Sequence, residues 1–231
     1  MAAFAAAVAV GVTHLETDVH ATADGALVAF HDARLERLTD LSGAVADVTL
    51  TTLQRARLGT ERVPLLEDVL AAWPSIRVNV DLKSPAAVAP FVGLLRRTRS
   101  RDRVCVASFS DRRRRAAVRA LAAAGPVAYS LGLIASTDAV ALAAAGAPVP
   151  VLRRALQGAI ALQLPDRAGP VPVITRRLVH AVHRAGAQVH AWTVDDPIRM
   201  RELLDLGVDA IVTNRADLAV PIAQGLAHWA G

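Results

Sequence analysis

LETDVHATADGALVAFHD, residues 15–32, places acidic and histidine side chains at both ends of a predicted hairpin. β-Branched residues over 12–20 predict a strand, T-A-D-G at 22–25 predicts a turn, and the apolar run at 26–32 predicts a second extended segment. Such a stretch is either a solvated hairpin or part of an active site. The rest of the sequence decides between these interpretations.

The rest of the chain alternates predicted strands with predicted helices. After an Ala-rich opening helix that ends at Gly11, we expect strands at 76–83, 103–110, 127–132, 149–152, 159–165, 188–195 and 209–214. Helices are expected at 65–73, 86–99, 112–124, 137–145, 175–185 and 197–206, with one more after the last strand. This alternation is typical of an α/β fold with a parallel sheet. The number of strands favours one TIM (β/α)8 barrel domain over 1–231.

The composition excludes several classes of function. Aromatic residues make up only 3% of the chain, too few to stack nucleic-acid bases, so nucleic acid is not an expected partner. The formal charge of +5 is spread along the chain and suits an anionic small-molecule substrate. The apolar opening is far shorter than the ~20 residues that span a bilayer, so no stable membrane insertion is expected. The composition leaves the oligomeric state unknown.

Four polar side chains share one face of the first predicted strand, because side chains alternate across a strand. They are His14, Glu16, Asp18 and His20. Asp81 and Lys83 repeat this arrangement at the end of another strand. Three carboxylates without a cysteine pattern favour a hard divalent cation, Mg²⁺ or Ca²⁺. Pairing of these acids with arginines around the barrel mouth is the alternative.

Two further residues carry chemical information. Lys83 is the only lysine among 26 basic residues, and its compact ammonium suits a phosphate oxygen or a neighbouring carboxylate. His31 follows an apolar run, and the adjacent Asp32 can hold its ring in one tautomer. A histidine near a metal ion and a phosphate is a candidate general acid or base.

These motifs resemble, in order, the signature of the glycerophosphodiester phosphodiesterases, which are barrel enzymes. The family pattern runs E-x-D, T-x-D-G, V-x-x-H-D, L-x-R-x-T and G-x-V-x-D-x-T. The chain carries it as ETD (16–18), TADG (22–25), VAFHD (28–32), LERLT (35–39) and GAVADVT (43–49). The resemblance continues through VPLLEDVL (63–70), VNVDLK (78–83), VASFS (106–110), VHAWTVDD (189–196) and LGVDAIVTNRAD (206–217). It covers essentially the whole chain.

The resemblance implies a hydrolase of lipid metabolism that cleaves a glycerophosphodiester to an alcohol and glycerol 3-phosphate, assisted by one divalent cation. The metal ligands that it implies are Glu16, Asp18 and Asp81, the last standing where the family usually has Glu. Lys83 and Trp192 match substrate contacts on the phosphate and glycerol sides. His31 matches one of two catalytic histidines.

The family's first strand, with His-Arg-Gly followed by Pro-Glu-Asn, has no counterpart in residues 1–231. We therefore expect a barrel missing its first strand and loop, about 25 residues, and with them one catalytic histidine and a phosphate-binding arginine. The strands at 12–20 and 209–214 would keep unpaired edges, and activity would be impaired. On this interpretation we expect Met1 to be a misassigned start. We expect a cytoplasmic protein unless a signal sequence was lost upstream.

Two other functions stay open. One is a catalytically inactive barrel that still binds a metal ion or a phosphodiester, which the missing histidine favours. The other is a lysophospholipase D-type hydrolase, although no extended apolar loop near the barrel mouth indicates a membrane substrate.

Overall fold

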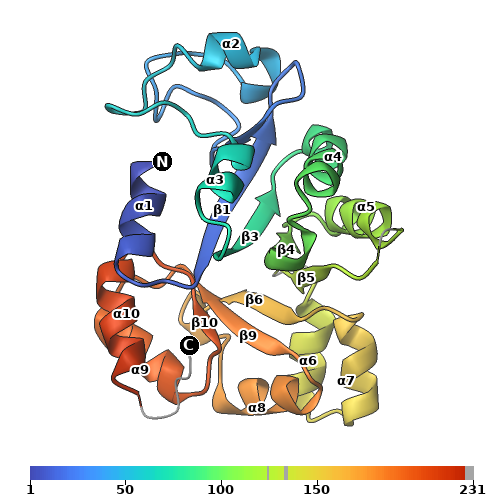
Figure 1. Ribbon diagram of the computed structural model, residues 1–231. Coiled ribbons are helices and arrows are strands. Elements are labelled where there is room, and N and C mark those ends of the chain that lie inside the picture. The colour runs from blue at the N-terminus through green and yellow to red at the C-terminus, as the bar shows by residue number, and fades with distance from the viewer. Residues whose placement is uncertain (124, 133–134, 227–231) are drawn as a thin grey trace. The chain divides into compact units, whose positions relative to one another are not determined.

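Strands and helices alternate along the chain, as Figure 1 shows for the computed structural model. The structure describes residues 1–123, 125–132 and 135–226. Internal contacts divide the chain into two compact units. The first joins Met1–Ala9 to Thr13–Ala128, and the second joins Val10–Val12 to Tyr129–Gly231.

The first unit contains the predicted hairpin and the strand that carries Asp81. Its helices and strands are α1 (Ala2–Ala9), β1 (His14–Ala21), β2 (Leu27–Ala29), α2 (Leu50–Leu53), α3 (Leu66–Ala72), β3 (Arg77–Leu82), α4 (Val88–Thr98), β4 (Val104–Ala107) and α5 (Asp111–Ala122). Single turns of 3-10 helix lie at Val45–Asp47, Pro85–Ala87 and Arg101–Arg103. Apart from α2 and the first of these turns, the segment between β2 and α3 is largely irregular.

The strands of the first unit pair in a defined register. β3 lies parallel to β1, β4 lies parallel to β3, and β2 returns antiparallel along β1. The register sets Glu16 opposite Asn79 and Asp18 opposite Asp81. Because β1, β3 and β4 run in the same direction, their carboxyl ends lie at one edge of the sheet.

Two groups of apolar side chains hold this unit together. On β1, buried Leu15 and Val19 alternate with the half-buried acids, which confirms the predicted faces of the strand. α4 adds the fully buried Phe91 to the core. A separate cluster consists of Val28, Phe30, Leu35, Val45, Leu53, Ala56 and Val63. This cluster anchors the irregular segment after β2, and therefore the chain on both sides of His31.

The second unit repeats the alternation. Its helices and strands are β5 (Ala128–Leu131, which starts at the unit boundary), α6 (Thr137–Ala145), α7 (Val149–Leu156), β6 (Ala161–Pro165), β7 (Arg167–Ala168), β8 (Val171–Pro172), α8 (Arg176–Arg184), β9 (Gln188–Trp192), α9 (Pro197–Asp205), β10 (Ala210–Ile211) and α10 (Ala216–Gln224). β5, β6, β9 and β10 pair in parallel, and β7 and β8 form a short antiparallel ribbon.

The core of the second unit consists mainly of Ala, Val and Leu, with Ile174 and Met200. Leu162 and Leu164 on β6 and Val189 on β9 are fully buried, together with Leu178 and Val182 on α8. None of the helices in the described ranges has both the length and the apolar character that crossing a bilayer requires.

One predicted strand is wrong. Residues 149–152 lie in α7, where Leu152 and Leu156 are buried four residues apart and Arg153 and Arg154 lie between them. Pro150 is tolerated in the first turn, because the N–H that proline lacks would have no partner within the helix there. A window of four residues is too short to show helical periodicity. The predicted segment 26–32 also shortens, since the strand ends at Ala29.

Substitution of Leu162 by Ala is predicted to lower the free energy of unfolding by about 2–5 kcal/mol, because its fully buried side chain leaves a cavity. Chemical denaturation followed by circular dichroism measures this change. Ile198→Ala is the control, since that side chain is 71% exposed and should change stability by less than about 0.5 kcal/mol. Equal effects of the two substitutions would contradict the assignment of β6 to the core.

Candidate active site

The predicted acids converge where β1 and β3 approach their carboxyl ends. Glu16 and Asp18 lie on one face of β1, and the parallel register brings Asp81 of β3 directly beside Asp18. Asp81 is buried, whereas Glu16 and Asp18 are half-buried. The structure therefore brings the three predicted metal ligands into one region of the first unit.

Lys83 bridges two of these acids. Its Nζ lies 2.8 Å from Asp18 Oδ1 and 2.8 Å from Asp81 Oδ2, and its side chain is only 18% exposed. Burial alone would lower the pKa of Lys83, but the bonds to both carboxylates outweigh burial and raise it. Of the two partners that the sequence allows for this ammonium, phosphate and carboxylate, the structure shows the carboxylates.

Glu16 is the acid that lacks a counter-ion. Within the described residues its carboxyl group has no hydrogen bond or ion pair. Burial, and then repulsion from Asp18 and Asp81, raise its pKa to about 8, although Lys83 acts in the opposite direction. Two of the three carboxylates thus share one ammonium, and the raised pKa of Glu16 favours its protonated form in the absence of a second cation.

The same region contains a buried oxygen without a partner. Asp81 Oδ1 accepts no hydrogen bond within the described part of the chain, and neither does Asn79 Oδ1 on the same face of β3. A divalent cation would supply the missing charge and the missing partner, so the carboxylate set fits a hard metal ion. No three Asp, Glu, His or Cys side chains among the described residues are themselves arranged to hold such an ion. The ligand set therefore stays a prediction.

His31 follows β2 and carries an oriented ring. Its Nδ1 lies 2.7 Å from Asp32 Oδ1, and because a carboxylate only accepts, Nδ1 is the protonated nitrogen. Arg37 donates two hydrogen bonds to Asp32, at 2.5 and 2.8 Å. Arg37 first, and then His31, hold the pKa of Asp32 far below its usual value. The predicted orientation of His31 by Asp32 is therefore present, although the His31 side chain is 65% exposed.

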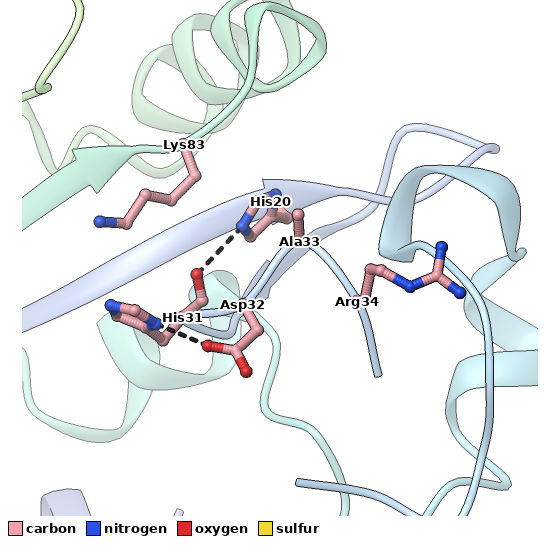
Figure 2. A pocket seen from close by; sticks show the side chains of 6 residues that line it. All are labelled: His20, His31, Asp32, Ala33, Arg34 and Lys83. Atoms are coloured by element: carbon pink, nitrogen blue, oxygen red, sulfur yellow. Dashed lines mark hydrogen bonds and ion pairs between the residues drawn. The ribbon is translucent and has the colours of Figure 1, made fainter. Parts of the chain in front are cut away.

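A cavity of about 500 Å³ contains this ring. It is lined by His20, His31, Asp32, Ala33, Arg34 and Lys83. In Figure 2 the Lys83 ammonium and the His31 ring extend to the same side, whereas the Arg34 side chain extends to the opposite side. Arg34 instead pairs with Glu36 at 2.5 Å. Of the lysine and arginine side chains that line the cavity, Lys83 is therefore the one that lies on the side of the His31 ring.

Two residues near Lys83 were not assigned a role from the sequence. His20 lies within β1, is buried and lines the cavity. The ring of Phe109, in V-A-S-F-S after β4, lies 5.0 Å from Lys83 Nζ and makes a cation–π contact. His20 could have been found from the sequence, because it shares a face of the strand with Asp18. No sequence pattern pointed to Phe109.

Trp192, the predicted contact on the glycerol side, belongs to the second unit. It ends β9, pairs in register with Pro165 of β6 and is half-buried. Its role as a substrate contact stays a prediction.

Comparisons with known proteins by family model, by sequence and by structure all find the same family. The model of the glycerophosphoryl diester phosphodiesterase family matches residues 1–218. The chain is 42% identical over 235 residues to the Mycobacterium tuberculosis protein named "Probable glycerophosphodiester phosphodiesterase 2", covering 100% of this chain and 87% of that protein. The solved glycerophosphodiester phosphodiesterase from Agrobacterium tumefaciens superposes with a TM-score of 0.72 at 24% identity, over 95% of this chain and 91% of that one.

A third relative was solved with a bound molecule. A phosphodiesterase from Oleispira antarctica, in complex with the product sn-glycerol-3-phosphate, superposes with a TM-score of 0.74 at 21% identity, over 96% of this chain and 89% of that one. These structural likenesses confirm the predicted fold class, an α/β fold of the TIM-barrel type.

The raised pKa of Glu16 predicts how stability depends on pH without added divalent cation. An acid whose pKa is higher in the folded chain binds more protons when folded, so stability falls as pH rises from about 4.5 to about 8. Each pH unit in that window costs up to about 1.4 kcal/mol. Glu16→Gln removes this loss and should be more stable than the parent at pH 8.5 but not at pH 4.5.

Urea denaturation at both pH values measures the difference. Glu67→Gln is the control, because it removes one carboxylate from the surface of the same unit. Parent and Glu16→Gln curves with the same pH dependence would show that Glu16 is not buried among like charges.

Proposed function

Because this chain belongs to the glycerophosphoryl diester phosphodiesterase family, we propose that its site hydrolyses a glycerophosphodiester to an alcohol and glycerol 3-phosphate with one divalent cation, Mg²⁺ or Ca²⁺. One observation carries the proposal. Three carboxylates lie near a single ammonium, that of Lys83, which bonds to two of them. Lys83 also lines the cavity that contains the oriented ring of His31. We also propose that residues 1–231 act as one barrel domain, since the family match spans 1–218.

The substrate class is supported by the charge and size of the cavity. Lys83 supplies a positive charge beside a hollow of about 500 Å³, which suits a small anionic phosphodiester. The related phosphodiesterase in complex with sn-glycerol-3-phosphate has the same fold, which supports a glycerophosphodiester as substrate.

His31 is the proposed proton-transfer group. Its Nδ1 donates to Asp32, which leaves Nε2 as the nitrogen that can give a proton to the leaving alcohol oxygen or take one from water. Asp32 is itself held by Arg37, so the imidazole keeps one tautomer. Lys83 lines the cavity, and its ammonium would be available to a phosphate oxygen if a divalent cation were held by Asp18 and Asp81.

The metal ligands are proposed to be Glu16, Asp18 and Asp81. When bound, a divalent cation neutralises charge on the phosphate oxygens and orients the reacting groups. The buried Asp81 oxygen without a partner and the raised pKa of Glu16 both support a cation at this position. Asp81 replaces the longer Glu that the family usually has, so a water molecule or a small shift of the ion would fill the difference.

Release of glycerol 3-phosphate from glycerophosphocholine tests the proposal. We expect turnover with Mg²⁺ or Ca²⁺, at a rate that the missing histidine and arginine reduce, and loss of turnover with chelator. Replacing His31 by Ala should lower kcat by about 10²–10⁴-fold, the usual contribution of general acid–base catalysis. His180→Ala is the control, because that exposed histidine lies on α8 in the second unit.

Other results would point to the two remaining functions. An ion that binds without turnover of any phosphodiester, in this chain and in a longer product of the same reading frame, would indicate an inactive barrel. Turnover of lysophospholipid alone would indicate a lysophospholipase D-type hydrolase. Full activity of His31→Ala would exclude His31 from the chemistry.

Metal binding gives a second test that does not depend on turnover. Isothermal titration with Mg²⁺ and Ca²⁺ at pH 7 should show one site and proton release, because the ion displaces the proton from Glu16. Asp81→Asn should weaken binding by about tenfold or more, since the number of ligand charges tunes affinity. Asp102→Asn is the control, because that side chain is 88% exposed. Equal affinities of the two variants would remove Asp81 from the ligand set.

A further inference from the structure

His20 holds the backbone of His31. Its ring nitrogen Nε2 lies 3.3 Å from the carbonyl oxygen of His31, and Figure 2 shows this bond reaching from β1 to the segment after β2. A carbonyl oxygen only accepts a hydrogen bond, so Nε2 is the nitrogen that carries the proton. Within the described residues, this ring is the single donor to that carbonyl.

At residue 31 itself the other restraints are few. β2 ends at Ala29, and the last backbone bond of the hairpin joins Phe30 N to Asp18 O at 3.0 Å. Beyond that bond the chain leaves β1, and the His31 side chain is largely exposed. Buried Phe30 anchors the chain just before it, whereas at residue 31 itself Asp32 holds the ring and His20 holds the backbone carbonyl.

His20 is itself fixed. It is 7% exposed and pairs in register with Val28 on β2. A buried group on a paired strand gives a rigid point from which to hold a more exposed residue.

We propose that His20 is a positioning residue that holds His31 in place for proton transfer. This inference rests on the proposed function, since it concerns the histidine to which that function assigns the proton. A displacement of about 1 Å in a catalytic group can cost on the order of 10²-fold in rate, so the loss of a single anchor is measurable.

Two substitutions separate the hydrogen bond from the volume of the ring. His20→Leu fills a similar space but has no donor, whereas His20→Gln places an amide N–H at about the reach of Nε2. With saturating metal ion, His20→Leu should lower kcat by about 10- to 100-fold and change KM by less than about threefold. His20→Gln should restore most of kcat. His180→Leu, on the exposed face of α8, is the control and should match the parent.

A second readout does not depend on turnover. In protein labelled with ¹³C at histidine, the carbonyl shift of His31 and the order parameter of its ring should both change in His20→Leu and return in His20→Gln. If the parent protein is inactive but its His31 signals respond in this way, the proposed function is refuted, whereas the role of His20 in holding His31 is supported.

Three results would overturn the inference. The first is that His20→Leu and His20→Gln have equal kcat and equal His31 signals. The second is a rise in KM alone, and the third is a loss of kcat that is fully explained by the fraction of the variant protein that is unfolded. A rise in KM alone would make His20 a substrate contact.

Discussion

The parallel register of β1 and β3 is the constraint on which the candidate site depends. It sets Asp18 opposite Asp81, so that one ammonium, two residues beyond Asp81, reaches both carboxylates at 2.8 Å. Side chains alternate along a strand, so a shift of one residue would turn all these groups to the other face. The apolar partners Leu15 and Val19 oppose such a shift, because it would expose them. The packing of the sheet and the convergence of the acids therefore have the same cause.

The site divides into an acidic part on the sheet and an imidazole part on the hairpin. Glu16, Asp18 and Asp81 stand on paired strands, where their separation is set by hydrogen bonds between backbones. His31 stands on the chain that leaves the hairpin and is held by single side-chain bonds. The rigid part suits the binding of an ion at fixed distances, and the looser part suits a group that exchanges protons with a substrate that enters and leaves.

Sequence patterns predicted the alternating faces of β1, the hairpin and the link between His31 and Asp32, because these depend on neighbours in the chain. They did not predict that Lys83 bridges Asp18 and Asp81, which requires the register between two strands. The helix at Val149–Leu156 was missed because four residues do not reveal a period of 3.6. The bond from His20 to the carbonyl of His31 was beyond prediction, since an accepting backbone oxygen leaves no trace in residue type.

Lys83 gives the molecule an unusual chemical handle. The other 25 of the 26 lysine and arginine residues are arginines, so an acylating or reductive-alkylating reagent finds one ε-amine in the entire chain, besides the terminal amine. That amine lies between two carboxylates, which keep it protonated and therefore unreactive as a nucleophile. The rate at which Lys83 is labelled therefore reports how often its ammonium leaves the two carboxylates. The natural sequence permits this measurement without an introduced probe.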